Sequence, residues 1–240
     1  PSPESLARLL PILQEYGLDK GIDRDLFEAG DPKTLQEVLE AARKADAGEL
    51  VSMLLLRSLK RACYEPHVAQ HFGLALQRYA HFTSPIRRYP DLVVHRMLAA
   101  QLRGDTEAAE RIAPHLQEIA DRSSAMERVA DDAARESQEL KLVEYLQNFI
   151  GEIFPGTIVR IVGYGFFVEL ENTAVGLVAL GDAVDDVFAL NVERQTLTGR
   201  ESGVQFRLGQ HVLVRLTAAR PAERQLDFSL VSKPRRGKGC

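Results

Sequence analysis

Two adjacent arginines, Arg87 and Arg88, follow Ser84 and Pro85 in the sequence. Serine is favoured just before a helix and proline suits the first helical position, so this spacing predicts a helix over 84–103. The first turn of a helix normally favours acidic residues, because the backbone N–H groups there are unpaired and the helix dipole is positive. Arginines in that turn cost stability, but together with the free N–H groups they suit an anion such as a phosphate.

The spacing of neighbouring charges supports an ordered arginine. Arg87, Asp91 and His95 stand four residues apart, so one helical face can hold a guanidinium against a carboxylate. Pro90 interrupts this pattern because it has no N–H to donate. Either the first turn is separate and the main helix restarts at Pro90, or the helix is kinked. The simpler alternative is that both arginines pair with acidic residues on a solvated surface.

Helical patterns dominate the chain before residue 150. Their apolar residues recur at helical spacing and are typical of a scaffold. The last segment contains no Gly or Pro after Pro114, and it predicts one long helix of about 35 residues, which is unusual in a compact domain. The predicted helices cover 4–16, 33–44, 48–62, 84–103 and 114–149.

The character of the sequence changes at Gly151. Short β-rich runs separated by turn residues continue to Val231, a pattern typical of a small β-barrel. We therefore place a domain boundary near residue 150. The predicted strands cover 157–162, 165–170, 176–180, 195–197, 205–207, 211–217 and 225–230.

Composition limits the classes of protein that need to be considered. No stretch is long and apolar enough for a membrane span, and the N-terminal residues do not resemble a secretory signal. The two cysteines, Cys63 and Cys240, do not form a disulfide framework, which fits a reducing cytoplasm. The net charge of −4 excludes a uniformly basic protein but leaves room for local basic patches, among them a tail at 233–240.

The run from His71 to His95, which reads HFGLALQRYAHFTSPIRRYPDLVVH, resembles the signature segment of the ribonuclease II/ribonuclease R catalytic domain, the RNB domain. Residues 53–62 are similar to the buried helix that precedes this segment in the family. The resemblance implies that Arg87 is the catalytic arginine near the scissile phosphate. It also implies that Tyr79, His81 and Arg88 take part in RNA binding.

The long helix carries a segment, Ser124-Ala-Met-Glu-Arg-Val-Ala-Asp131, that is similar to the family's Ala-Glu-Arg-Arg sequence. The similarity places Glu127 at a position that contacts RNA near its 3′ end. Without the resemblance, Glu127 would be one more charged residue on a solvated helix face.

The sequence after Gly151 resembles the RNA-binding OB fold that ends ribonuclease R chains. Two glycines around Tyr164 permit a tight hairpin, which presents Tyr164, Phe166 and Phe167 as candidates for RNA binding. Because side chains alternate along a strand, the two phenylalanines face opposite sides and only one can belong to the core. The other can stack on a base, unless both are apolar filler. Ala179 departs from the pattern, since a histidine commonly supports RNA contact there.

The whole resemblance implies an α+β fold: the mainly helical C-terminal part of an RNB catalytic domain over 1–150, a five-stranded OB barrel over 151–232, and the basic tail. It further implies a hydrolytic, processive 3′→5′ exoribonuclease, monomeric and cytoplasmic, that degrades single-stranded RNA to nucleoside 5′-monophosphates.

The resemblance also implies Mg²⁺ as a cofactor, held in this family by an Asp-x5-Asp-x-Asp-Asp cluster. The pattern does not occur in this sequence, and the adjacent pairs at 131–132 and 185–186 lack spaced partners. We therefore expect no metal ligands in this chain and no activity from it alone. The alternative is a noncatalytic RNA-binding protein that uses the barrel for RNA and the helical half for protein partners.

Overall fold

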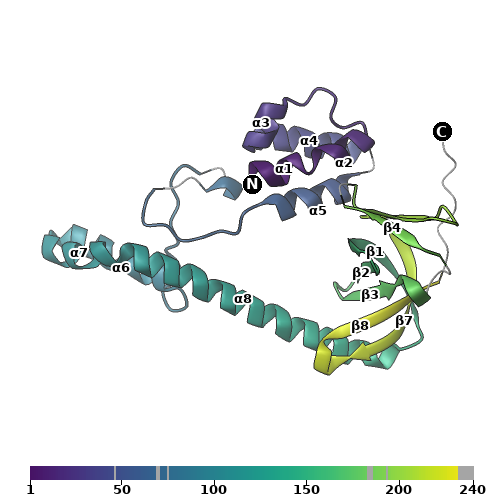
Figure 1. The fold of residues 1–240 in the computed structure, drawn as a ribbon. Helices are drawn as coiled ribbons and strands as arrows, with labels where there is room; N and C mark the ends of the chain where they lie inside the picture. Colours follow the sequence, from purple (N-terminus) through teal and green to yellow (C-terminus); the bar gives the residue numbers. More distant parts are fainter. Residues whose placement is uncertain (46, 69–70, 75, 183–185, 193, 232–240) are drawn as a thin grey trace. The chain divides into compact units, whose positions relative to one another are not determined.

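The computed structural model describes residues 1–45, 47–68, 71–74, 76–182, 186–192 and 194–231 (Figure 1). The chain forms two compact units. Unit 1 joins Pro1–Leu59 to the chain from Glu136 onward, and unit 2 is Lys60–Arg135. The basic tail predicted at 233–240 lies outside the described residues.

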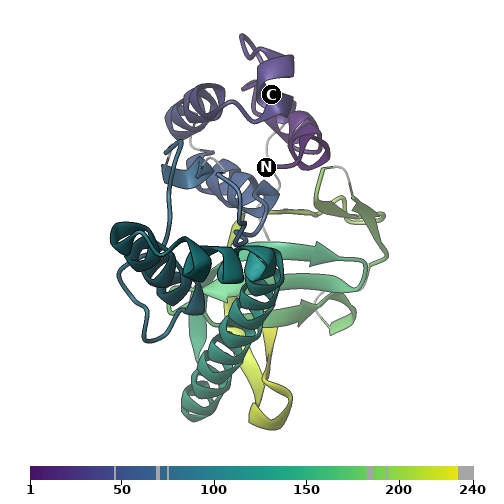
Figure 2. The same cartoon turned by 90° about the vertical axis from the view of Figure 1, so that its left-hand side faces the viewer.

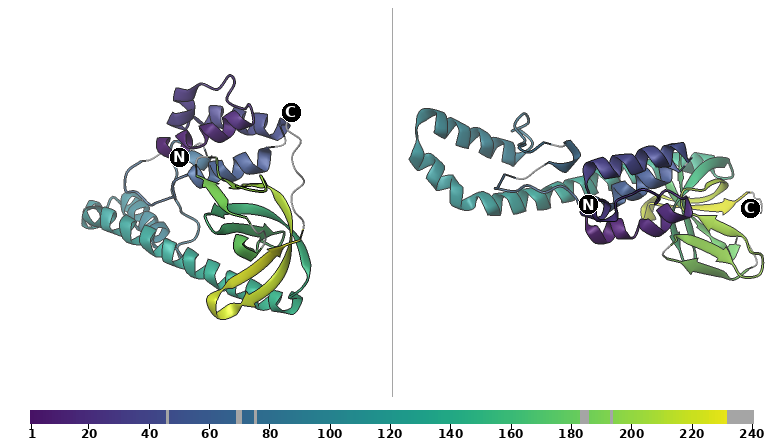
Figure 3. Two further views of the ribbon diagram at one scale, coloured as in Figure 1. Left: turned by 45° about the vertical axis from the view of Figure 1, so that its right-hand side comes forward. Right: turned by 90° about the horizontal axis from the view of Figure 1, so that it is seen from above.

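Unit 1 begins with a group of short helices, drawn purple to blue in Figure 3. Their bounds are α1 Pro3–Ala7, α2 Leu10–Glu15, α3 Arg24–Ala29, α4 Pro32–Lys44 and α5 Gly48–Ser58. The single helix predicted over 4–16 is two helices, because Pro11 cannot donate a backbone hydrogen bond and stands in the first turn of α2. Asp31 caps α4 by accepting a hydrogen bond from the Thr34 N–H at 2.8 Å.

The second part of unit 1 is a closed five-stranded barrel, as the sequence predicted (Figure 2). Its order is β1-β2-β3-β8-β7; β3 and β8 pair in parallel and the other pairs are antiparallel. A Cβ on Gly176 would lie 2.4 Å from the Phe228 ring, so only glycine permits this close approach of β3 to β8. The strand bounds are β1 Ile153–Val162, β2 Gly165–Leu170, β3 Val175–Ala179, β7 His211–Arg220 and β8 Gln225–Leu230.

A three-stranded antiparallel sheet is inserted between β3 and β7. It consists of β4 Phe188–Asn191, β5 Thr196–Gly199 and β6 Gln205–Arg207. The sequence pattern did not predict β4, whose side chains are largely exposed and lack the alternation typical of a strand.

The barrel core extends beyond the barrel itself. Ile12 of α2 and Leu50 of α5 belong to the same buried cluster as Phe166 of the barrel and Leu197 of the inserted sheet. An ion pair of 2.6 Å joins Glu15 of α2 to Arg207 of β6. The cluster that these N-terminal helices join therefore includes barrel and inserted-sheet residues, and the charged contact is to the inserted sheet.

Unit 2 combines an extended segment with helices. Among the described residues of 60–88, the regular structure is one 3-10 turn, Phe72–Leu74, and an isolated bridge between His71 and Leu76. Helices α6 Tyr89–Arg103 and α7 Thr106–Ile112 follow, and α8, Leu116–Leu146, passes from unit 2 into unit 1. At 31 residues, α8 confirms the predicted long helix. No described helix combines the length and apolar character that a membrane span requires.

Candidate nucleic-acid interface

The arginine pair lies on a turn that precedes α6. The carbonyl of Ser84 accepts hydrogen bonds from the N–H groups of Arg87 and Arg88, at 3.3 and 3.1 Å. Helix α6 begins only at Tyr89, so the predicted start of a helix at Ser84 is wrong and the separate-turn alternative at Pro90 is the observed one. The cause is local, because Pro90 has no N–H to continue a helix that starts at Ser84, whereas a proline is tolerated in the first turn of a helix that starts at Tyr89.

Asp91 fastens this turn to α6. Its carboxylate is 0% exposed, and its Oδ2 accepts from the Ser84 N–H at 2.8 Å and from Nη2 of Arg88 at 2.9 Å. The predicted pairing of Arg87 with Asp91 is therefore wrong. The partner is Arg88, because the separate turn changes which arginine faces the helix.

The electrostatics of this ion pair favour the charged forms. Burial by itself would raise the pKa of Asp91, but the Ser84 N–H and the guanidinium of Arg88 outweigh it, and the pKa lies below the ordinary 3.8. Asp91 thus neutralises Arg88 in the fold. Two atoms of the pair, Oδ1 of Asp91 and Nε of Arg88, are buried without a hydrogen-bond partner among the described residues.

Arg87 has the opposite environment. Its side chain is exposed and makes no hydrogen bond or ion pair with any residue that the structure describes. Its neighbour Ile86 is 98% exposed. The turn therefore presents one free guanidinium and holds the other in place.

Four rings follow one another in edge-to-face contacts in unit 2. His71 contacts Tyr79, Tyr79 contacts His81 and His81 contacts Tyr64, with centroid distances of 4.8, 5.6 and 5.5 Å. The Tyr64 hydroxyl lies 3.1 Å from Nδ1 of His81. Sequence reasoning missed Tyr64, which follows the predicted helix at 48–62 in a segment without periodicity. The feature of the sequence that could have pointed to Tyr64 was a tyrosine hydroxyl within a run of polar residues.

Helix α8 approaches the same cluster. Burial, followed by the negative charge of Glu127, raises the pKa of Tyr64, while the positive charge of Arg88 opposes the rise. Glu127 and Arg88 are therefore both close enough to act on the Tyr64 hydroxyl. Four predicted RNA-binding residues of unit 2 are thus linked to these rings: Tyr79 and His81 belong to them, and Arg88 and Glu127 act on the Tyr64 hydroxyl.

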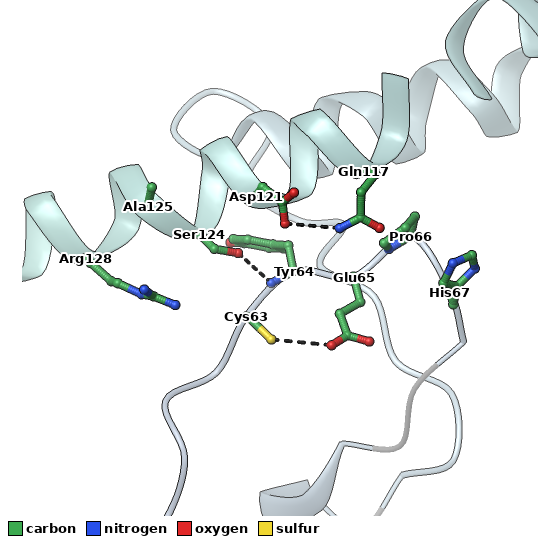
Figure 4. A pocket seen from close by; sticks show the side chains of 10 residues that line it. All are labelled: Cys63, Tyr64, Glu65, Pro66, His67, Gln117, Asp121, Ser124, Ala125 and Arg128. Atoms are coloured by element: carbon green, nitrogen blue, oxygen red, sulfur yellow. Dashed lines mark hydrogen bonds between the residues drawn. The ribbon is translucent and has the colours of Figure 1, made fainter. Parts of the chain in front are cut away.

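A pocket of about 440 Å³ lies between residues 63–67 and α8 (Figure 4). The Tyr64 N–H donates to Oγ of Ser124 at 2.9 Å, which fixes the extended segment on the helix. Asp121 accepts from Gln117 at 3.1 Å on the same face, and Arg128 projects beside the pocket. The pocket therefore has mixed charge and polar walls.

The barrel contributes a second set of candidates. The Phe166 ring is 0% exposed and contacts Phe206 at a centroid distance of 4.7 Å. Phe167 points to the other face, where the guanidinium carbon of Arg160 lies 4.8 Å from its ring centroid. Tyr164, in the turn between β1 and β2, is 62% exposed. The predicted RNA contact of Phe166 is corrected, because a fully buried ring cannot stack on a base.

Ala179 ends β3 opposite Gly165 in the barrel register. The methyl side chain offers no hydrogen bond at this position, beside the turn that carries Tyr164. The aromatic and cationic candidates of the barrel are thus Tyr164 and Arg160, which are exposed, and Phe167, which is half-buried.

The described residues do not supply a metal site. Nowhere in the described ranges do three or more His, Cys, Asp or Glu side chains gather in a way that would hold a metal ion. Asp132 pairs with Arg135 at 2.7 Å, and Asp186 accepts from Ser202. Asp185 lies outside the described residues. The described residues thus do not fit a Mg²⁺ site.

An OB barrel with an exposed tyrosine and a half-buried phenylalanine beside an arginine, together with an exposed arginine on an ordered turn, is typical of a nucleic-acid-binding protein. Residues 1–104 match the family model of the RNB domain, and residues 147–230 match that of the S1 RNA binding domain. These matches confirm the resemblance of the chain to the ribonuclease II/ribonuclease R family.

Named relatives agree with this assignment. The chain is 41% identical to ribonuclease R of Aquifex aeolicus over 97% of its length, and 36% identical to ribonuclease R of Escherichia coli over 98%. It covers 33% and 30% of those two proteins. The chain therefore spans about a third of the length of the curated relatives it matches.

Solved structures show the same fold. The apo form of Mycoplasma genitalium RNase R aligns with a TM-score of 0.84 and 27% identity, over 96% of this chain and 36% of that one. The same enzyme in complex with ribose methylated single-stranded RNA aligns with a TM-score of 0.82 and 26% identity, with the same coverage.

Proposed function

We propose that this chain provides RNA-holding residues of a hydrolytic, processive 3′→5′ exoribonuclease that degrades single-stranded RNA to nucleoside 5′-monophosphates. The whole protein acts as a cytoplasmic monomer in this proposal. Support comes from the two family matches and from relatives that are named ribonuclease R.

The observation that carries the proposal is the contrast between the two arginines of one turn. Asp91 engages Arg88 and orders the turn, whereas Arg87 is exposed and unpaired among the described residues. A planar guanidinium on an ordered turn suits a phosphate, with which it can form two hydrogen bonds. In the proposed reaction Arg87 stabilises the negative charge that develops on the scissile phosphate.

The remaining candidates hold the RNA strand. Three of them lie in the signature segment of unit 2: Tyr79, His81 and Arg88. In the proposal, Glu127 of α8 contacts the 3′-terminal nucleotide. On the barrel, Tyr164 and Phe167 offer ring faces for stacking, which accepts any base sequence. The related M. genitalium enzyme is described in complex with a single-stranded RNA, which supports this class of ligand.

Mg²⁺ belongs to the proposal for the whole protein. When bound, it would activate water and neutralise charge on the phosphate oxygens. Because the Asp-x5-Asp-x-Asp-Asp pattern does not occur in the sequence, we propose that its ligands belong to sequence outside these 240 residues.

The test uses the purified chain and a labelled single-stranded RNA. We expect binding that weakens linearly with the logarithm of salt concentration, because phosphate contacts release counterions. We expect no mononucleotides in the presence of Mg²⁺. Release of mononucleotides by the pure chain would contradict the assignment of the metal ligands. Failure to bind RNA at low salt would contradict the RNA-holding role.

A second candidate is the noncatalytic RNA-binding protein, and one observation favours it. Three large apolar residues of unit 2 are strongly exposed: Val68 at 79%, Ile86 at 98% and Leu102 at 78%. Exposed apolar side chains of this kind suit a protein contact, from a partner or from further chain of the same protein. The sequence encoded before Pro1 discriminates: an Asp-x5-Asp-x-Asp-Asp segment there favours the enzyme, and its absence favours the binding protein.

A further inference from the structure

Tyr64 connects α8 to the signature segment. Its backbone N–H donates to Oγ of Ser124 at 2.9 Å, and the Ser124 hydroxyl in turn donates to the carbonyl of Ala120 at 2.8 Å. Ser124 is buried, so this anchor is shielded from solvent. At the other end of the residue, the phenol oxygen lies 3.1 Å from Nδ1 of His81. Tyr64 is thus fixed at its backbone and directed at one atom of His81.

The chemistry of the pair sets the direction of the hydrogen bond. Burial and the charge of Glu127 raise the pKa of the Tyr64 phenol, which therefore keeps its proton at neutral pH. A phenol hydroxyl is a stronger donor than acceptor and the bare nitrogen of a neutral imidazole is a good acceptor, so the favoured direction is from the Tyr64 hydroxyl to Nδ1. When Nδ1 accepts, the hydrogen of the ring must be on Nε2.

The ring plane of His81 is also held. The rings of Tyr64 and Tyr79 meet the imidazole edge-to-face, with interplanar angles of 78° and 82°. Contacts of this geometry are favourable for aromatic rings and resist rotation of the imidazole about its side-chain bonds.

We propose that Tyr64 is a positioning residue that holds His81 in the tautomer with hydrogen on Nε2, so that His81 donates this hydrogen to an oxygen atom of bound RNA. The inference rests on the proposed function, because it assigns an RNA contact to the same site. It adds the atom that makes the contact and the residue that prepares it.

The first test measures the tautomer without RNA. Histidine ¹⁵N signals of the 240-residue chain are recorded above about pH 8, where an ordinary imidazole is neutral. We expect a pyridine-like Nδ1 and a pyrrole-like Nε2 for His81, and a mixture of tautomers in Tyr64→Phe. Tyr145→Phe, at an exposed tyrosine of α8 outside unit 2, is the matched control and should leave the His81 signals unchanged. An unchanged tautomer in Tyr64→Phe would overturn the proposal.

The second test measures RNA affinity in a double-mutant cycle. The amide nitrogen of glutamine lies near the position of Nε2, so His81→Gln keeps a donor at that position without help from Tyr64. The shorter side chain in His81→Asn does not place a donor there. We expect Tyr64→Phe to weaken RNA binding roughly three- to tenfold in the His81 background, the range for one lost hydrogen bond. In the His81→Gln background it should have no further effect.

The two backgrounds separate positioning from a structural role. An equal loss of affinity in both backgrounds would show that Tyr64 only supports the fold, and would overturn the proposal. If the unsubstituted chain does not bind RNA, the proposed function fails, together with the RNA contact of His81. The ¹⁵N signals then still decide whether Tyr64 sets the tautomer.

Discussion

Nη2 of Arg88 lies 2.9 Å from Oδ2 of Asp91, and the Asp91 carboxylate is completely shielded from solvent. The same carboxylate oxygen accepts from the Ser84 N–H, so one buried atom closes the turn and binds its second arginine. This arrangement explains how two neighbouring arginines divide their tasks. Arg88 is held in the turn by Asp91, and the side chain of Arg87 is left exposed.

Asp91→Asn should destabilise the protein. The change leaves the guanidinium of Arg88 without its counter-charge, and loss of one partner of a buried pair costs roughly 3 kcal/mol of unfolding free energy. Urea denaturation followed by circular dichroism measures this cost. Glu107→Gln breaks the exposed pair with Arg111 in the same unit and serves as the control, with an expected cost below about 1 kcal/mol. Equal small effects of both substitutions would refute the structural role of Asp91.

Arg87→Ala should affect catalysis more than folding. In the whole enzyme we expect kcat on single-stranded RNA to fall roughly 100-fold, as for the loss of one electrostatic contact to the transition state. RNA affinity and the midpoint of thermal unfolding should change little. Arg111→Ala, also at an exposed arginine, is the control and should leave turnover unchanged. Normal turnover of the Arg87→Ala enzyme would remove Arg87 from the proposed site.

The two adjacent phenylalanines of β2 should respond in opposite ways. Phe167→Ala should weaken RNA binding by about 1–3 kcal/mol, the range for one lost stacking contact, with little loss of stability. Phe166→Ala should lower the unfolding free energy by about 3–5 kcal/mol, because it empties a site in the barrel core. RNA titrations and urea denaturation of both variants measure the contrast. Undiminished RNA affinity of Phe167→Ala would show that the Arg160–Phe167 face is not the binding face.

Asp186 should make the stability of the inserted sheet depend on pH in the acid range. Hydrogen bonds from the Ser202 hydroxyl, the Ser202 N–H and the Glu201 N–H lower the pKa of Asp186 from 3.8 to about 2. A pKa that is lower in the folded state adds stability above pH 3.8, and this contribution is lost as the pH falls toward about 2.

Asp186→Asn should therefore flatten the slope of unfolding free energy against pH between 3.8 and about 2. Glu171→Gln, at an exposed carboxylate in the turn after β2, is the matched control and should preserve the slope. An Asp186→Asn slope identical to that of the unsubstituted protein would contradict the contribution of these hydrogen bonds to the low pKa of Asp186.

Local patterns in the sequence were sufficient for most of the architecture. The stretch after Pro114 predicted α8, because a segment without Gly or Pro and with apolar residues at helical spacing has few alternatives to a helix. Short β-rich runs separated by turn residues predicted the barrel, because this pattern is typical of strands joined by tight turns. Strand β4 escaped prediction because its exposed side chains carry no alternation.

The sequence by itself also determined the family and the segment that carries the site, since the run from His71 to His95 is long and specific. Alternation along β2 determined that Phe166 and Phe167 face opposite sides. It did not determine which side is the interior. That choice depends on tertiary packing, which places Phe166 in the interior, where its ring contacts Phe206 of the inserted sheet.

Tertiary structure alone decided the partners within the site. Periodicity assigned Asp91 to Arg87, but a separate turn before Tyr89 changes the direction of the arginines and gives Asp91 to Arg88. Tyr64 meets His81 only because its backbone is bound to Ser124, 60 residues further along the chain. Contacts between such distant residues depend on the path of the whole chain, and no local pattern records that path.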